Sequence, residues 1–208
     1  MRRDTAVANL RRVADAVGRW AGLMEALPIR SLWTYGELLE PEVRTLDVAQ
    51  VALVVDLPAE EVSWMALPPA AVGFAGAAGL EKLPVARVWR PEVWPVWNHA
   101  IRRPVRIWGS GGPDQEAMAS LASGEGIADF RLPEPTPEVY REQLHTELAA
   151  TLVHLRQVTD AYWEREWRAD HKGFGIHPDD HLWRAAVGFL ELRKAAATAG
   201  IISDPDER

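Results

Sequence analysis

The chain has 208 residues, 48% of them hydrophobic, no cysteine and a formal net charge of −7. This length and composition fit one or two globular domains with a packed core, and the lack of cysteine excludes disulfides, a thiolate nucleophile and metal centres with cysteine ligands. The negative charge argues against non-specific binding to nucleic acid or to an anionic membrane, because the far field repels phosphates.

The first predicted element is an amphipathic helix over residues 5–27. Its apolar side chains recur at alternating steps of three and four, which places them on one face: Leu10, Val13, Val17, Trp20, Met24 and Leu27. Asp4 suits the N-cap, and Pro28 is expected to end the helix. No apolar stretch reaches about 18 residues, so we predict neither a signal peptide nor a membrane span and expect a cytoplasmic protein.

Two buried strands with a glycine between them are predicted next. Residues 29–35 are rich in aromatic and branched side chains and are followed by Gly36, which suits a turn. Residues 48–55 form a nearly continuous apolar run, the pattern of a strand buried on both faces.

The middle of the chain predicts short helices and two further strands. A short helix is expected near residues 59–65, and the strands are expected over residues 85–89 and 105–108. Residues 68–80, which are rich in glycine and alanine, favour no single state. Residues 115–121 predict another short helix.

The last third of the chain predicts two helices after a connector with three prolines, residues 131–137. A long helix is expected from about residue 137 to residue 167, with an apolar stripe of Leu144, Leu148, Leu152, Leu155, Val158 and Tyr162. A loop over residues 169–177 then leads to a helix over residues 178–197. This last helix is expected to pack through Leu182, Ala186, Phe189 and Leu190. The exposed faces of the two helices could pair in a homodimer.

This order of elements predicts an α+β fold in two parts. Residues 1–130 are expected to form an α/β domain with a mixed sheet and flanking helices, and residues 137–200 a C-terminal helical domain. Residues 203–208 have the composition of a disordered tail.

A helix, a strand that ends in glycine and a buried strand that follows an aspartate resemble the start of the nucleotidyltransferase superfold. The minimal and antibiotic-modifying members are closest in plan. In that family a Gly-Ser pair ends the first strand, a Ser-Asp-x-Asp stretch begins the next, and a third carboxylate lies on a later strand. The glycine and serine contact a triphosphate, and the three carboxylates hold the Mg²⁺ that stabilises phosphoryl displacement.

The resemblance is one of framework, because most of the chemical groups differ. Gly36 matches the family's glycine, but Glu37 replaces the serine and would repel a triphosphate. Asp47 matches the first acid, Ala49 replaces the second, and residues 85–89 contain no third acid. The resemblance therefore implies a degenerate site with Asp47 as its catalytic candidate and with Gly36 and Glu37 beside the ligand. The whole chain also resembles an uncharacterised bacterial family of pseudo-nucleotidyltransferase type.

Residues 87–108 have an unusual composition of arginine and tryptophan. The segment contains Arg87, Arg90, Arg102, Arg103, Arg106, Trp89, Trp94, Trp97 and Trp108, with Glu92 as the one acid. In one interpretation Arg87, Arg102 and Arg103 bind phosphates in a groove, and Trp97 stacks on a base or a ligand ring. In the other, the strand tryptophans belong to the core, and the arginines cover them while pairing with the surplus of acids.

His171, His177 and His181 lie close together in the sequence, with Asp170 directly before them and Asp179 and Asp180 between them. A metal site is one interpretation, because His177 and His181 would share a helix face. The other is a helix start, since Pro178 suits the first helical position and acids there face the positive end of the helix dipole. The helix start needs no ligand, and we assign no metal.

Arg165 and His171 are separated by five residues. The spacing is similar to that of the catalytic Arg and His in helical ribonucleases that pair with minimal nucleotidyltransferases. In such enzymes the Arg stabilises phosphate charge and the His transfers protons at the 2′-hydroxyl. The resemblance is limited to the spacing, because the intervening residues depart from the family pattern.

Two hypotheses of function follow. The first is a non-catalytic, nucleotidyltransferase-like binding or regulatory module without a cofactor, whose partner is an unknown ligand or protein; a variant is a nucleotide or nucleic-acid binder that uses the Arg/Trp-rich segment. The second is a divergent Mg²⁺-dependent nucleotidyltransferase that uses Asp47 with Glu37 and Asp56. Asp47 and Asp56 flank one strand, roughly 30 Å apart if it is extended, so they could not hold one ion.

Overall fold

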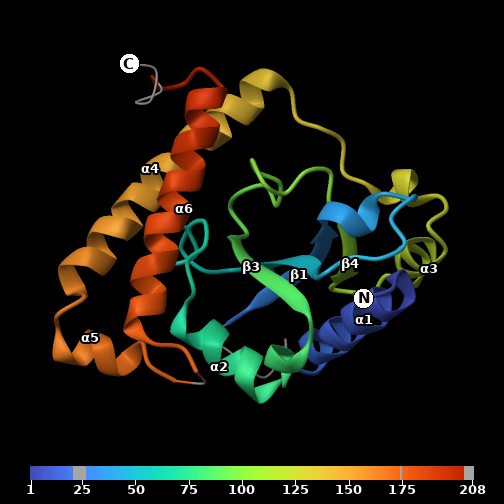
Figure 1. The fold of residues 1–208 in the computed structure, drawn as a ribbon, viewed down its shortest axis with the longest axis horizontal. Coiled ribbons are helices and arrows are strands. Elements are labelled where there is room, and N and C mark those ends of the chain that lie inside the picture. Colours follow the sequence, from blue (N-terminus) through green and yellow to red (C-terminus); the bar gives the residue numbers. More distant parts are fainter. Residues whose placement is uncertain (21–26, 174, 204–208) are drawn as a thin grey trace.

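The computed structural model describes residues 1–20, 27–173 and 175–203 (Figure 1). It shows a mixed five-stranded sheet, flanking helices and a pair of long C-terminal helices, which confirms the α+β fold. Within these residues no helix is both long and apolar enough to cross a bilayer.

The sheet is built around two central strands that the apolar pattern predicted. The strands are β1 (Ile29–Tyr35), β2 (Ala49–Val55), β3 (Val85–Pro91), β4 (Val105–Gly109) and β5 (Gly112–Pro113). Their order is β3-β2-β1-β4-β5; β1 is antiparallel to β2 and β4, and β3 is parallel to β2. The four predicted strands are confirmed, and β3 lies at an edge of the sheet.

One face of the sheet is covered by α1 (Arg3–Trp20) and α3 (Gln115–Ser123). The apolar stripe of α1 packs there against alternate residues of β2, including Val51 and Leu53. Met24, expected at the end of this helix, lies outside the described residues, as do residues 204–208 of the expected tail.

The other face of the sheet packs against α4 (Pro137–Ala161) and α6 (Pro178–Thr198), which run side by side in Figure 1. Their shared core includes Tyr35 and Ala52 of the sheet, Leu144 of α4 and Leu192 of α6. Both faces of β2 are therefore buried, as its continuous apolar run predicted.

The prediction of one continuous helix from residue 137 to 167 is wrong near its end, because α4 ends at Ala161 and a separate α5 (Arg165–Asp170) follows. The backbone of Glu164 is extended, which breaks the helix. The break gathers aromatic rings: the Tyr162 and Trp163 ring centroids are 4.9 Å apart. The loop expected over residues 169–177 accordingly begins later, after the last turn of α5.

The prediction of the residues through which α6 packs is also wrong. The buried residues of α6 are Pro178, His181, Ala185, Gly188, Leu192 and Ala196, whereas Leu190 is 57% exposed. The reason is a close approach of the backbone, because a Cβ atom at Gly188 would lie 2.4 Å from the carbonyl oxygen of Trp64. Small side chains on this face let α6 reach the turn at residues 64–65.

The helix expected near residues 59–65 is absent from the structure, and turns take its place. Met65 adopts a left-handed φ of 65°, which is incompatible with a continuing helix. The helix starts later, as α2 (Pro69–Ala77), where a proline occupies the first helical position. The glycine- and alanine-rich residues 68–80 thus fold mainly as a helix.

A buried ion pair joins the edge strand to the helical half. Arg90 of β3 donates from Nη1 to Glu147 Oε2 over 2.7 Å and from Nη2 to Glu147 Oε1 over 2.6 Å, and both side chains are fully buried. Gln143 and Asn98 also donate to this carboxylate. Burial raises the pKa of Glu147, but the charge and hydrogen bonds of Arg90 outweigh it and hold the pKa below its ordinary value.

Removing one partner of this pair should be strongly destabilising. Arg90→Met is expected to lower the free energy of unfolding by about 3–5 kcal/mol, because it leaves the Glu147 carboxylate buried without its counter-charge. The double variant Arg90→Met/Glu147→Leu should recover much of this loss. Urea unfolding measures both values, and an Arg90→Met variant as stable as the exposed-site control Arg106→Met would contradict the assignment.

Candidate functional site

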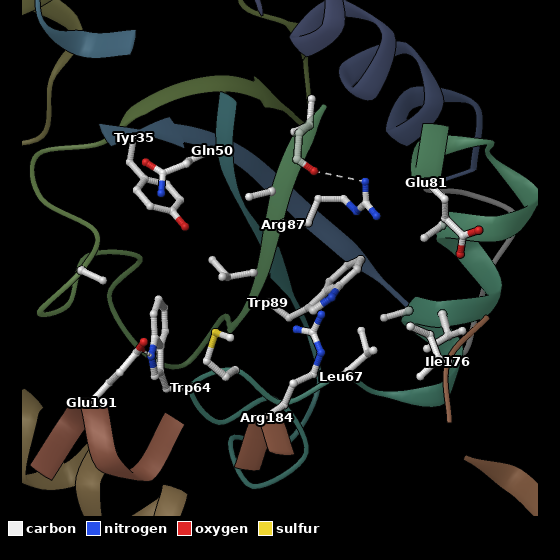
Figure 2. Close-up of a pocket in the computed structure, with 18 residues that line it drawn as sticks. Tyr35, Gln50, Trp64, Leu67, Glu81, Arg87, Trp89, Ile176, Arg184 and Glu191 are labelled. Carbon is white, nitrogen blue, oxygen red and sulfur yellow. Dashed lines mark hydrogen bonds between the residues drawn. The ribbon is translucent and has the colours of Figure 1, made fainter. Parts of the chain in front are cut away.

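A cavity of about 540 Å³ lies along β3, between α2, α6 and the turn at residues 64–67 (Figure 2). Its volume is within the range of small-molecule sites. Side chains of α2 and β3, among them Val72 and Val88, give it an apolar wall, and Trp64 and Met65 form another. The polar groups are concentrated at its two ends.

Two arginines define one end of the cavity. Arg87 extends from β3 and Arg184 from α6. Both line the cavity, and in the view of Figure 2 the Trp89 ring lies between their guanidinium groups. The Nη1 group of Arg87 donates to the carbonyl oxygens of Leu80 (2.7 Å) and Val85 (3.3 Å). Among the described residues, neither guanidinium has a carboxylate oxygen within 4.0 Å.

The charges of these arginines are incompletely compensated. Burial lowers the pKa of Arg87 and that of Arg184. The proximity of Arg184 lowers the pKa of Arg87 further, while Glu81 acts in the opposite direction; Asp180 raises the pKa of Arg184. The same end of the cavity therefore holds two partly desolvated cations that favour an anion.

The other end of the cavity carries neutral and acidic groups. Glu191 Oε2 accepts a hydrogen bond of 2.7 Å from Trp64 Nε1 and lies 4.0 Å from His99 Nε2. Burial raises the pKa of Tyr35 to about 12; Glu191 adds to this effect and Arg90 opposes it. The Tyr35 hydroxyl therefore stays protonated. In Figure 2 the Tyr35 side chain lies beside that of Gln50, on the wall opposite α6.

The residues that the nucleotidyltransferase resemblance singled out do not line this cavity. Gly36 follows β1 with φ of 78°, and a Cβ atom there would lie 1.8 Å from Oε1 of Gln50. Glu37 and Asp47 are exposed and do not line the cavity. Ala49 packs on the opposite side, in the core with α1, and the residue of β2 that lines the cavity is Gln50.

The acids available to a metal are dispersed. Asp56, at the far end of β2, forms an ion pair with Arg30, which also bonds Glu92 over 3.1 Å. Throughout the described ranges, no group of three or more His, Asp or Glu side chains is arranged to hold a metal ion.

The Arg/Trp-rich segment is divided between two places. Arg87 lines the cavity, whereas Arg102, Arg103 and Trp97 line a neighbouring groove that also contains Tyr140. The strand tryptophans, Trp89 and Trp108, are buried in the core, as the structural interpretation predicted. The expected pairing of the arginines with acids is found for one of them. Among the described residues, Arg90 is the only arginine of the five that has a carboxylate partner.

The structure brings together a different set of histidines from the three that lie close in the sequence. The rings of His171 and His181 approach to 4.8 Å between centroids, and with His154 of α4 they line a second pocket, separate from the cavity along β3. His177 is exposed at the N-cap of α6, where its backbone N–H donates to Asp180 Oδ2 over 2.7 Å. The helix-start interpretation is therefore confirmed for His177.

Arg165 and His171 occupy opposite ends of the six-residue helix α5. Arg165 is exposed in the first turn, while the His171 ring stacks on Trp167 with 4.0 Å between centroids. His171 Nδ1 lies 2.8 Å from the carbonyl oxygen of Trp167. His171 is thus engaged within its own helix.

Of the residues that line the cavity, sequence reasoning singled out Arg87 as a ligand-binding candidate and missed Tyr35, Gln50, Trp64, Arg184 and Glu191, among others. One signal was present, because Gln50 is the single polar residue in the apolar run 48–55. Arg184 and Glu191 carry no such signal, since their place depends on how α6 packs against the sheet.

The comparisons with known proteins give a family but no relative with a known role. A family model described as a domain of unknown function, DUF7711, matches residues 1–198. No curated protein and no solved structure matches the chain.

Gly36→Ala should be destabilising and should disturb the cavity wall. A left-handed φ costs an alanine about 1–2 kcal/mol, and the new methyl group would displace Gln50. The free energy of unfolding from urea titration measures this cost. Gly111→Ala is the control, because nothing lies within 4 Å of a Cβ atom at that position; equal effects of the two changes would contradict the argument.

The stability of the protein should fall in mild acid through His181. Burial is the main reason that its pKa is lowered from 6.5 to about 4, and His171 and Arg184 add to the effect. Between these two values the unfolded chain binds a proton that the folded protein does not, so stability is lost as the pH falls from about 6.5 to about 4.

Urea unfolding at several pH values tests this assignment. His181→Leu should flatten the pH dependence in that window. His145→Leu, at an exposed position on α4, should keep the wild-type profile. A His181→Leu profile with the wild-type slope would assign the acid sensitivity to other groups.

Proposed function

The chain belongs to the DUF7711 family, a domain family of unknown function, and we propose that it is a non-catalytic binding module for a small organic anion. The ligand occupies the cavity along β3, with its anionic group between Arg87 and Arg184.

The observation that supports this function is the pair Arg87 and Arg184, neither of which has a carboxylate partner among the residues that the structure describes. A guanidinium that is withdrawn from water without a counter-charge is unfavourable, and a bound carboxylate or phosphate compensates it with charge-assisted hydrogen bonds. Arg87 already uses Nη1 for two backbone carbonyls, which fixes its orientation and leaves other N–H groups for the ligand.

The rest of the cavity favours a ligand with an apolar or planar body. Val88, Trp64 and Met65 offer apolar contact along its length. At the far end, the Tyr35 hydroxyl and the Gln50 amide can bind a neutral polar group, while Glu191 accepts hydrogen bonds and disfavours a second anion. The ligand is thus an anion at one end and neutral at the other.

The degenerate nucleotidyltransferase resemblance is compatible with this proposal. The residue of β2 that lines the cavity is an amide, Gln50, which binds Mg²⁺ less strongly than a carboxylate does. Glu37 and Asp47 are exposed outside the cavity. These placements support binding without catalysis, and nucleotides remain a natural class of anion to test.

A thermal-unfolding screen tests the proposal directly. The probes are the four ribonucleoside triphosphates, the corresponding monophosphates, and a set of aromatic and aliphatic carboxylates, each with Mg²⁺ and with EDTA. A ligand that binds the folded state raises the unfolding midpoint, and we expect a rise that does not require Mg²⁺. A rise that requires Mg²⁺ and is lost in Asp47→Ala would instead support the divergent enzyme.

Calorimetric titration of the best probe then locates the site. Arg184→Gln should weaken binding by about tenfold to a hundredfold, the value of a hydrogen bond to a charged group. Arg156→Gln removes an exposed arginine of α4 and should leave the affinity unchanged. If no probe shifts the midpoint, or if both variants bind equally well, the proposal is wrong.

A further inference from the structure

A second site lies beyond the cavity, in a groove between residues 97–103, the start of α4 and the end of α6. We call it the basic groove and define it by Arg102, Arg103, Arg141, Lys194, Trp97 and Tyr140. Two adjoining hollows of about 720 and 260 Å³ form it, and Arg102, Pro137 and Tyr140 line both. We propose that the basic groove binds a short segment of single-stranded nucleic acid.

The charge of the groove is opposite to that of the whole chain. Acidic side chains outnumber basic ones by 30 to 23, so a basic side chain usually has acids available. Yet among the described residues no carboxylate oxygen lies within 4.0 Å of any of the four cations of the groove, which are Arg102, Arg103, Arg141 and Lys194. A local cluster of unpaired cations can attract phosphates at close range although the far field repels them.

The acids of the groove do not neutralise this cluster. Glu191 is held by the Trp64 indole on the side of the cavity. Glu134 is exposed at the far end of the groove. The four cations come from three segments along the groove, residues 102–103, α4 and α6. They therefore suit successive phosphates of a chain better than one isolated phosphate.

An aromatic pair supplies the surface that bases require. The Trp97 and Tyr140 rings are stacked with 6.5 Å between centroids and 28° between planes. They line the hollow that contains Arg103. Stacking on such rings accepts any base, and it requires unpaired bases, which favours a single strand over a duplex.

The loop that forms one wall of the groove is fixed by buried groups. Asn98 Oδ1 accepts hydrogen bonds of 2.9 Å from the backbone N–H groups of Ala100 and Ile101. Arg90 donates to the carbonyl oxygen of Trp97 over 3.4 Å, and Arg131 to that of Arg103 over 3.2 Å. A wall that is ordered before binding reduces the entropy that a ligand must overcome.

Fluorescence anisotropy with labelled oligothymidylate and oligouridylate of about 12 nucleotides, within the span of known single-strand binding domains, tests the proposal. The expected result is binding to both single strands and weaker binding to a duplex of the same length. Contacts to three or four phosphates predict a slope of about −2 to −3 for the logarithm of the binding constant against the logarithm of salt concentration.

Variants on the surface identify the groove. Arg102→Glu/Arg141→Glu changes two exposed side chains and should weaken binding at least tenfold, while Arg156→Glu/Arg193→Glu, outside the groove, provides a matched change of charge. Trp97→Phe should weaken binding and leave the salt slope unchanged. Arg184→Gln should leave oligonucleotide binding unchanged, which separates this site from the cavity along β3.

Three results would overturn the proposal. One is the absence of single-strand binding at about 50 mM salt, where phosphate contacts are strong. Another is an equal loss in the two double variants, which would reduce the effect to net charge. The third is inorganic phosphate or a mononucleotide binding as tightly as the oligonucleotides, which would assign the groove to a small phosphate compound.

Discussion

The bidentate ion pair between Arg90 and Glu147 is the constraint on which both sites depend. It closes the end of β3 against α4, and the same guanidinium bonds the carbonyl oxygens of Pro95 and Trp97. Its position therefore fixes two things together: the edge strand that borders the cavity and the loop that forms the basic groove. A buried pair of this kind contributes specificity of arrangement more than net stability, because desolvation offsets most of its attraction.

The second determinant is the close approach of α6 to the turn at residues 64–65. Gly188 permits it, since any side chain there would collide with the Trp64 carbonyl. With α6 in this register, Arg184 and Glu191 enter the cavity, and Leu190 faces outward. Gly188 therefore helps to set which charged side chains of α6 reach the cavity.

The sequence predicted the parts of the fold that depend on continuous apolar runs, and it failed where polar residues are buried. The central strands were correct because residues 29–35 and 48–55 carry strong local patterns. The stripe of α6 was misassigned because His181 is buried while Leu190 is exposed, and the burial of Glu147 on α4 was missed. The turn at Gly36 was correct, but the cavity was missed, since the convergence of Arg87 and Arg184 is a property of packing that no local pattern carries.

The two sites share a wall, and this has a thermodynamic consequence. Glu191 lines both the cavity and the basic groove. Its carboxylate is held by Trp64 on one side and lies 4.0 Å from His99 on the other. If both proposals hold, an anion in either site would act electrostatically on this one carboxylate, so occupation of one site would change the cost of occupying the other. Linkage requires that change to be the same in both directions, whichever ligand binds first.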